Sequence, residues 1–282
     1  MDRDHVMLDL LAVPRALIGV VHVGALPGTP AARESLDRIV ETAICEAQIY
    51  RDAGFHALMI ENMHDRPYLK REVGGEIVAA MTAVGCAVRR KANLPLGVQV
   101  LAGANRAALA VAAACGASFV RVEGFVFAHV ADEGLIEADA GELLRYRRAI
   151  GAGDVRVFAD IKKKHASHAL TSDVDLIEMV RAAEFFLADG VIVTGAATGR
   201  EADAREVAAV AQAVGVPTLV GSGVTASNLS RFASADGFIV GSSVKHGGVW
   251  SNALDPARAR ELVRAFAALG NPAAAAPVPP RA

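Results

Sequence analysis

Two turns rich in glycine and serine near the end of the chain have the composition of a phosphate-binding site. Each follows a short apolar run, at residues 216–220 and 235–240. Glycine lets a ligand approach the main chain closely, and a turn that leads into a helix presents N–H groups to an anion. The turns therefore predict a phosphate cradle formed by Gly221, Ser222, Gly223, Gly241 and Ser242.

A second set of polar residues stands at the ends of other apolar runs. Buried polar groups cost free energy unless they are paired, so their gathering at strand ends indicates a ligand site. The alternative is that each strand simply reaches solvent there. Apart from the two turns, the set comprises His22, Glu61, Asn62, Arg121, Glu123, Asp160, Lys162 and Thr194.

Asp160 and Glu61 are the predicted acid/base residues of this site. A carboxylate that faces a cation across a small site can have its pKa moved toward neutrality, as proton transfer requires. The alternative is a structural salt bridge to Arg121 or Lys162. While Asp160 and Glu61 exchange protons, Arg121, Lys162 or His22 would stabilise developing negative charge.

A basic run follows the fifth predicted strand. Alternation along an extended chain predicts that Lys162 and Lys164 point the same way as Asp160. Either lysine could then form a Schiff base or hold an anion, and a solvated loop is the alternative. His165 and His22 are candidate general bases.

No cofactor is predicted, and metal binding has little support. His22, Glu61 and Asp160 could form a mixed nitrogen and oxygen site, but no local ligand spacing points to one. The cysteines lie in alanine-rich helical stretches, also without metal-ligand spacing, and are predicted to be buried free thiols in a reducing compartment. They are Cys45, Cys86 and Cys115.

Eight alternations of strand and helix position these residues. Strict alternation predicts parallel strands, and a phosphate site after strands seven and eight is typical of a (β/α)8 TIM barrel. The alternative, an open doubly wound sheet, is disfavoured because the turn after the first strand lacks a GxGxxG pattern. The predicted strands are residues 16–23, 56–60, 95–101, 118–123, 155–160, 190–194, 216–220 and 235–240.

The helices between them follow apolar residues at helical spacing. The first is predicted to end at Gly54, and the fifth to begin after Ser172 as its N-cap. A short helix is predicted from Ala226, and the loop 124–139 is long enough to suggest a function. The predicted helices are 34–53, 72–91, 105–115, 140–150, 173–188, 201–214 and 256–269.

The α/β barrel is predicted to occupy residues 16–270 as a single domain. Residues 1–15 form a lead-in, and residues 271–282 are rich in alanine and proline and are predicted to be a disordered tail. Residues 188–195 resemble residues 235–242, as expected if both segments belong to the same half of a βα unit.

Composition limits the partners. The chain has 282 residues, 53% of them hydrophobic, and a formal charge of -2 without a block of Lys or Arg. This excludes nucleic acid and anionic membranes as expected partners and favours a small phosphorylated metabolite. Without a predicted signal peptide or membrane span, we expect a soluble cytoplasmic protein. The apolar composition suggests a homo-oligomer.

Six motifs follow one another along almost the whole chain. They are Ile18-Gly19-Val20-Val21-His22-Val23 with Leu26-Pro27-Gly28; Met59-Ile60-Glu61-Asn62 with Asp65 and Pro67; Arg145-Tyr146-Arg147; Ala159-Asp160 with Lys164-His165-Ala166; Thr194-Gly195-Ala197-Thr198-Gly199; and Gly221-Ser222-Gly223-Val224-Thr225. Together they resemble the BtpA/SgcQ family.

The resemblance implies a barrel similar to phosphate-binding barrels such as phosphoribosylanthranilate isomerase. It also implies an association with photosystem I biogenesis in cyanobacterial members and with carbohydrate uptake and metabolism in others. Two functions follow as hypotheses. One is an isomerase or lyase that acts on a small phosphorylated sugar or sugar-derived metabolite by proton transfer. The other is a non-catalytic assembly or biogenesis factor that kept the barrel.

Overall fold

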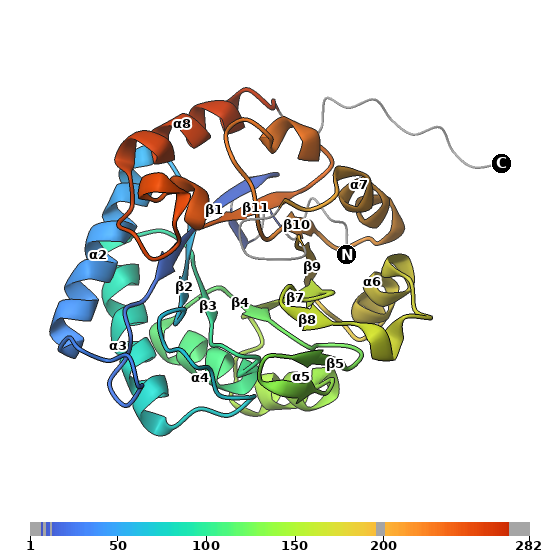
Figure 1. Cartoon of the computed structure of the whole chain (residues 1–282), viewed down its shortest axis with the longest axis horizontal. Helices are drawn as coiled ribbons and strands as arrows, with labels where there is room; N and C mark the ends of the chain where they lie inside the picture. Colours follow the sequence, from blue (N-terminus) through green and yellow to red (C-terminus); the bar gives the residue numbers. More distant parts are fainter. Residues whose placement is uncertain (1–6, 8–9, 12, 196–200, 271–282) are drawn as a thin grey trace.

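The computed structural model describes residues 7, 10–11, 13–195 and 201–270, and it shows a closed barrel of parallel strands (Figure 1). The barrel closes where the first strand pairs with the last, Ala16 opposite Gly237. The predicted (β/α)8 architecture is thus confirmed. Each barrel strand pairs with the barrel strands that precede and follow it in the chain, and the last pairs with the first. The barrel strands are β1 (Ala16–His22), β2 (Ala57–Glu61), β3 (Leu96–Gln99), β4 (Phe119–Val122), β7 (Arg156–Ile161), β9 (Gly190–Val193), β10 (Thr218–Val220) and β11 (Gly237–Val240).

The α-helices of the described residues form the outer ring (Figure 1). The first ends at Gly54, whose φ of 101° gives the predicted left-handed C-cap. The predicted N-cap Ser172 is wrong, because Asp175 caps α6 by accepting from the Glu178 N–H at 2.7 Å. The helices are α2 (Leu36–Ala53), α3 (Gly75–Ala92), α4 (Asn105–Cys115), α5 (Ala140–Ala149), α6 (Leu176–Phe185), α7 (Ala204–Ala213) and α8 (Pro256–Ala267).

Two apolar cores hold the barrel. Inside it, alternate strand residues such as Ile18, Phe119 and Phe158 are buried together, and Met7 and Leu11 from the lead-in pack against them. Outside, the opposite faces of the strands pack against the ring of helices. Because both faces of each strand are covered, the strands are apolar along almost their whole length, and polar side chains gather at their carboxyl ends.

The similarity between residues 188–195 and 235–242 has a structural cause. Asp189, before β9, donates its N–H to the Val157 carbonyl at 2.8 Å and accepts the Val157 N–H at 2.9 Å through its carboxylate. Asp236, before β11, makes the same pair of contacts with Thr218, both at 2.8 Å. Each aspartate therefore fixes the start of its strand against the preceding strand of the barrel.

Three local predictions are corrected. The loop 124–139 forms two strands, β5 (His129–Ala131) and β6 (Gly134–Ile136), and β8 (Ala166–Ser167) joins them in a small antiparallel sheet. The short helix after β10 is a 3-10 helix, η2 (Leu229–Phe232). Cys45 is exposed and Cys86 is half-buried, whereas Cys115 is buried as expected.

The predicted tail 271–282 and the motif residues Ala197, Thr198 and Gly199 lie outside the described residues. No helix in the part of the chain that the structure describes is long and apolar enough to cross a membrane.

Candidate functional site

A cavity of about 190 Å³ opens at the carboxyl ends of the barrel strands. All five predicted phosphate-binding residues line it, together with His22, Glu61, Arg121 and Lys164. The register explains part of this assembly, since His22 lies opposite Glu61 and Glu61 lies opposite Gln99 on adjacent strands. Paired residues of neighbouring strands point to the same face, so these three side chains form a row across the mouth.

The loops after β10 and β11 form the glycine-rich wall of this cavity. Gly223 has a φ of 70°, a left-handed conformation that favours glycine. A Cβ at Gly241 would lie 2.8 Å from Nε2 of His22, so only glycine leaves the imidazole in place. Ser222 Oγ accepts the Gly195 N–H at 2.8 Å and ties this wall to the end of β9. Thr194, also predicted to bind ligand, lies beside Gly221 but does not line the cavity.

Arg121 and Asp160 form a buried bidentate ion pair. Nε and Nη2 of Arg121 each donate to one carboxylate oxygen at 3.0 Å. Burial lowers the pKa of Arg121, but Asp160 and Glu61 more than offset this and raise its pKa, so the guanidinium stays charged. Only 1% of the Asp160 side chain is exposed, and it does not line the main cavity. The structure therefore contains the alternative named for Asp160, a salt bridge to Arg121.

The three lysines after β7 take three different positions, so the predicted alternation is wrong. Lys162 has a φ of 50°, which breaks the extended run, and its side chain is exposed. Lys163 is buried in ion pairs, and Lys164 lines the cavity. Burial, reinforced by the charge of Arg121, lowers the pKa of Lys164.

His22 is held as a neutral imidazole. Its Nδ1 lies 3.0 Å from the Trp250 carbonyl, which can only accept, so Nδ1 carries the proton and Nε2 presents its lone pair. Burial, with a smaller effect of the Lys245 charge, lowers the pKa of His22 to about 3. His22 can therefore accept a hydrogen bond from a ligand but is a weak base.

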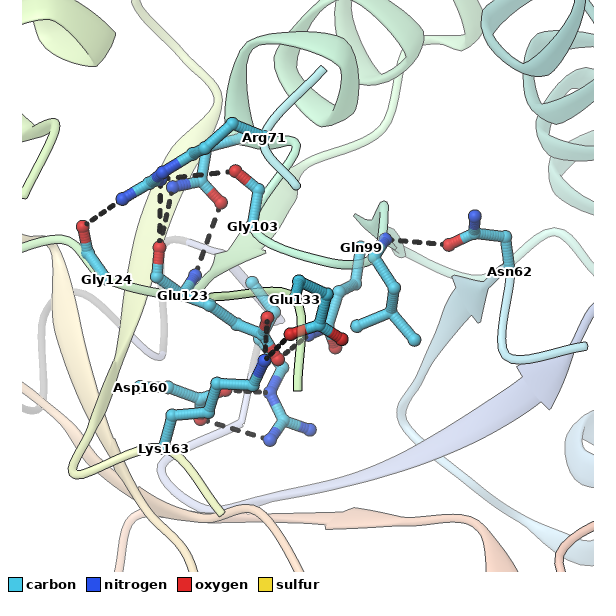
Figure 2. Close-up of polar contacts among 12 residues, drawn as sticks. Asn62, Arg71, Gln99, Gly103, Glu123, Gly124, Glu133, Asp160 and Lys163 are labelled. Atoms are coloured by element: carbon cyan, nitrogen blue, oxygen red, sulfur yellow. Dashed lines mark hydrogen bonds and ion pairs between the residues drawn. The ribbon is translucent and has the colours of Figure 1, made fainter. Parts of the chain in front are cut away.

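A second cavity, of about 70 Å³, adjoins the first. Glu61, Met63, Arg121 and Lys164 line both. Glu123 lies in the second cavity, where its carboxylate is 3.2 Å from Lys163 Nζ (Figure 2). His165, which is exposed, lines this cavity and not the first.

Arg71, which is labelled in Figure 2, and Asn105 fix the main chain around Glu123. Asn105 accepts the Glu123 N–H at 3.2 Å and donates to its carbonyl at 2.9 Å. Arg71 donates to the carbonyls of Glu123 and Gly124 and to Asp139. This network holds the end of β4 in place, so the Glu123 side chain is well positioned.

Asn62 connects three loops instead of lining either cavity. Its Oδ1 accepts the Leu101 N–H at 2.8 Å, and its Nδ2 donates to Asp65 at 2.9 Å. Asp65 in turn accepts the Leu26 N–H at 2.8 Å. The Glu61-Asn62 and Asp65 motif thus combines one cavity residue with two that align the loops after β1, β2 and β3.

Several residues that line the cavities were not predicted. Arg258 reaches the glycine-rich wall from α8, and its Nε donates to the Ser243 carbonyl at 2.9 Å. Gln99 was visible as a polar residue inside an apolar strand. Met63, Tyr68 and Glu133 lie in loops, where the sequence offers no comparable signal.

Among the described residues, no group of three or more His, Cys, Asp or Glu side chains is arranged to hold a metal ion. In particular, both carboxylate oxygens of Asp160 accept hydrogen bonds from Arg121.

The fold and its mouth define the class of protein, a (β/α)8 barrel with a polar cavity at the carboxyl ends of its strands. The barrel of N-(5'-phosphoribosyl)anthranilate isomerase from Pyrococcus furiosus is similar, with a TM-score of 0.55 over 90% of this chain and 99% of that one, at 15% identity. At that identity the likeness shows the fold alone.

The chain belongs to the BtpA family, whose model matches residues 13–268. It is 45% identical over 265 residues to an uncharacterized mitochondrial protein of Caenorhabditis elegans, covering 92% of this chain and 96% of that one. It is 35% identical over 258 residues to the photosystem I biogenesis protein BtpA of Synechocystis, covering 89% of this chain and 88% of that one.

Proposed function

We propose that this protein is an enzyme that binds a small phosphorylated sugar or sugar-derived metabolite and catalyses proton transfer, as an isomerase or a lyase. One observation carries the proposal: the glycine-rich loops after β10 and β11 share a single cavity with Glu61, Lys164 and His22. A phosphate-binding wall facing a carboxylate and cations is the arrangement that such chemistry needs.

The phosphate would lie against the loops that contain Gly221, Gly223 and Ser242. Glycine gives phosphate oxygens access to main-chain N–H groups, and the nearby Arg258 guanidinium adds positive charge. The solved structure of N-(5'-phosphoribosyl)anthranilate isomerase, whose name describes a phosphorylated substrate, has the same fold and supports this assignment.

Glu61 is the proposed proton carrier. It is 7% exposed and lines both cavities, so it can reach the carbon atoms next to the phosphate. Lys164 and Arg121 would stabilise the negative charge that develops when a proton leaves carbon. Asp160 is a positioning residue in this scheme, because both its oxygens hold Arg121. His22 accepts a hydrogen bond from a substrate hydroxyl.

Turnover of a panel of sugar phosphates tests the proposal. Glu61→Gln removes the proton acceptor and leaves the shape of the cavity unchanged, so we expect kcat to fall by about 10²–10⁴-fold. Stabilisation of the variant by inorganic phosphate, measured by thermal unfolding, should persist. Turnover that survives Glu61→Gln would contradict the role of Glu61.

A non-catalytic assembly factor is the second candidate, supported by the 35% identity to the photosystem I biogenesis protein of Synechocystis. Sugar phosphates that stabilise the folded protein without any turnover across the panel would favour this role.

A further inference from the structure

We propose that the second cavity binds hydroxyl groups on the carbon chain of the ligand. The ligand class is then a phosphorylated polyol or open-chain sugar, with its phosphate in the first cavity and its hydroxyl-bearing end beside Gln99. This inference rests on the proposed function, because it places the phosphate in the glycine-rich loops.

The two cavities lie next to each other. Glu61, Met63, Arg121 and Lys164 form walls of both, and the second adds about 70 Å³, enough for several water-sized groups. A ligand anchored by its phosphate at β10 and β11 therefore extends past Glu61 toward β3 and β4.

Gln99 carries an unsatisfied acceptor in the second cavity, whereas the unsatisfied oxygens of Glu123 and Glu133 there are ion-paired with Lys163. The Gln99 side chain is buried, with 2% of the residue exposed, and its Nε2 donates to Glu123 Oε1 at 3.3 Å (Figure 2). Burial raises the pKa of Glu123, and the neighbouring Lys163 opposes this rise. The carboxylate that is ion-paired with Lys163 can only accept, so its contact with Gln99 fixes the amide orientation. Gln99 Oε1 is then a buried acceptor without a hydrogen-bond partner among the described residues.

A buried acceptor of this kind costs about 1–3 kcal/mol until a donor reaches it. The row formed by His22, Glu61 and Gln99 presents a further lone pair at Nε2 of His22. A chain of hydroxyl groups supplies donors at several points, whereas an alkyl chain would leave Gln99 unsatisfied.

A second anionic group does not suit this cavity. Lys163 lies 3.2 Å from Glu123 and 3.5 Å from Glu133, so both neighbouring carboxylates already oppose its charge. These carboxylates offset the effect of burial and raise the pKa of Lys163, which keeps the group ionised and paired. The cavity therefore accepts hydrogen bonds from a neutral, donor-rich ligand end and does not bind a second phosphate or a carboxylate.

The test compares inorganic phosphate, pentyl phosphate and ribitol 5-phosphate by calorimetric titration of the full chain. The two organic phosphates have the same number of carbon atoms and differ in their hydroxyl groups. We expect ribitol 5-phosphate to bind at least about 10-fold more tightly than pentyl phosphate. Gln99→Met, close in volume and without an amide, should remove most of that gain and leave the affinity for inorganic phosphate unchanged.

Gln99→Leu serves as the second variant if Gln99→Met does not fold. Equal affinity of the wild type for the two organic phosphates, or a gain that survives loss of the amide, would overturn the inference while phosphate binding stands. If none of the three compounds binds the folded wild type, the proposed function and the inference fail together.

Discussion

The two sides of the barrel mouth are built from different groups. The side formed by the loops after β10 and β11 consists largely of glycine, serine and main chain, with Gly223 in a left-handed conformation. The side formed by β2, β3, β4 and β7 consists of buried charges, among them the Arg121–Asp160 pair and the Glu123–Lys163 pair.

Under the proposed function, the two sides have different tasks: one binds the phosphate, and the other acts on the rest of the ligand. Main-chain groups are fixed by the fold, so the glycine-rich side can bind an anion without moving charged side chains. On the charged side, Asp160 holds Arg121 and Glu123 holds Lys163, whereas Glu61, Lys164 and Gln99 line a cavity that the ligand would enter. Four predictions test this division.

Breaking the Arg121–Asp160 pair should have the largest effect on stability. Arg121→Met leaves the Asp160 carboxylate buried without its partner, which costs about 3–5 kcal/mol. Urea unfolding measures the loss. The double variant Arg121→Met, Asp160→Leu should recover most of the stability, because it removes both charges, but it should not recover activity. If Arg121→Met alone were as stable as the wild type, the Arg121–Asp160 pair would not stabilise the charged side of the mouth.

The second prediction concerns pH. The pKa of His22 is about 3 in the folded protein and about 6.5 in an unfolded chain, so the unfolded state binds more protons between these values. Stability should therefore fall as pH drops below about 6.5, by up to about 2 kcal/mol at pH 5. His22→Asn can still donate to the Trp250 carbonyl and should flatten this slope in unfolding curves. An unchanged slope in the variant would contradict the buried neutral imidazole.

The third prediction compares two glycines. Gly223 and Gly151 have φ values of 70° and 71°, but only Gly223 lines the cavity. Substitution of either by Asp adds similar backbone strain, up to about 1–2 kcal/mol. Only Gly223→Asp places a negative charge in the phosphate cradle, so it alone should abolish thermal stabilisation by phosphate. If phosphate stabilised both variants equally, the glycine-rich loops would not be the phosphate-binding site.

The smallest effect is expected for Lys162. Its side chain is exposed and does not line the mouth cavity, so Lys162→Met should change stability by less than about 0.5 kcal/mol and leave phosphate binding intact. Lys164→Met, the matched control two residues later, should lower turnover of a sugar phosphate. If the two variants behave in the opposite way in that assay, the assignment of the lysines is wrong.

The barrel could be predicted from the sequence because its signals are local. Apolar runs and turn residues mark the strands, and Gly54 marks a helix end through its backbone conformation. The glycine-rich loops could also be predicted, since glycine readily adopts a positive φ and lets a ligand approach the main chain closely.

The charged side could not be predicted to the same degree, because pairing depends on distances across the barrel. Nothing in the sequence decides between a free Asp160 and one held by Arg121, 39 residues away. The left-handed conformation of Lys162 breaks the extended run, so Lys162 is exposed while Lys164 lines the cavity, and no residue type signalled this. The position of Gln99 opposite Glu61 became visible only from the register between β2 and β3.

The central claim is that the loops after β10 and β11 bind the phosphate of the ligand. A crystal structure of the protein grown with inorganic phosphate tests it directly. We predict density for phosphate against the main chain of Gly223 and Ser242, within the cavity that contains Arg121 and Glu61. Phosphate bound elsewhere at saturating concentration, with this cavity filled only by water, would contradict the account.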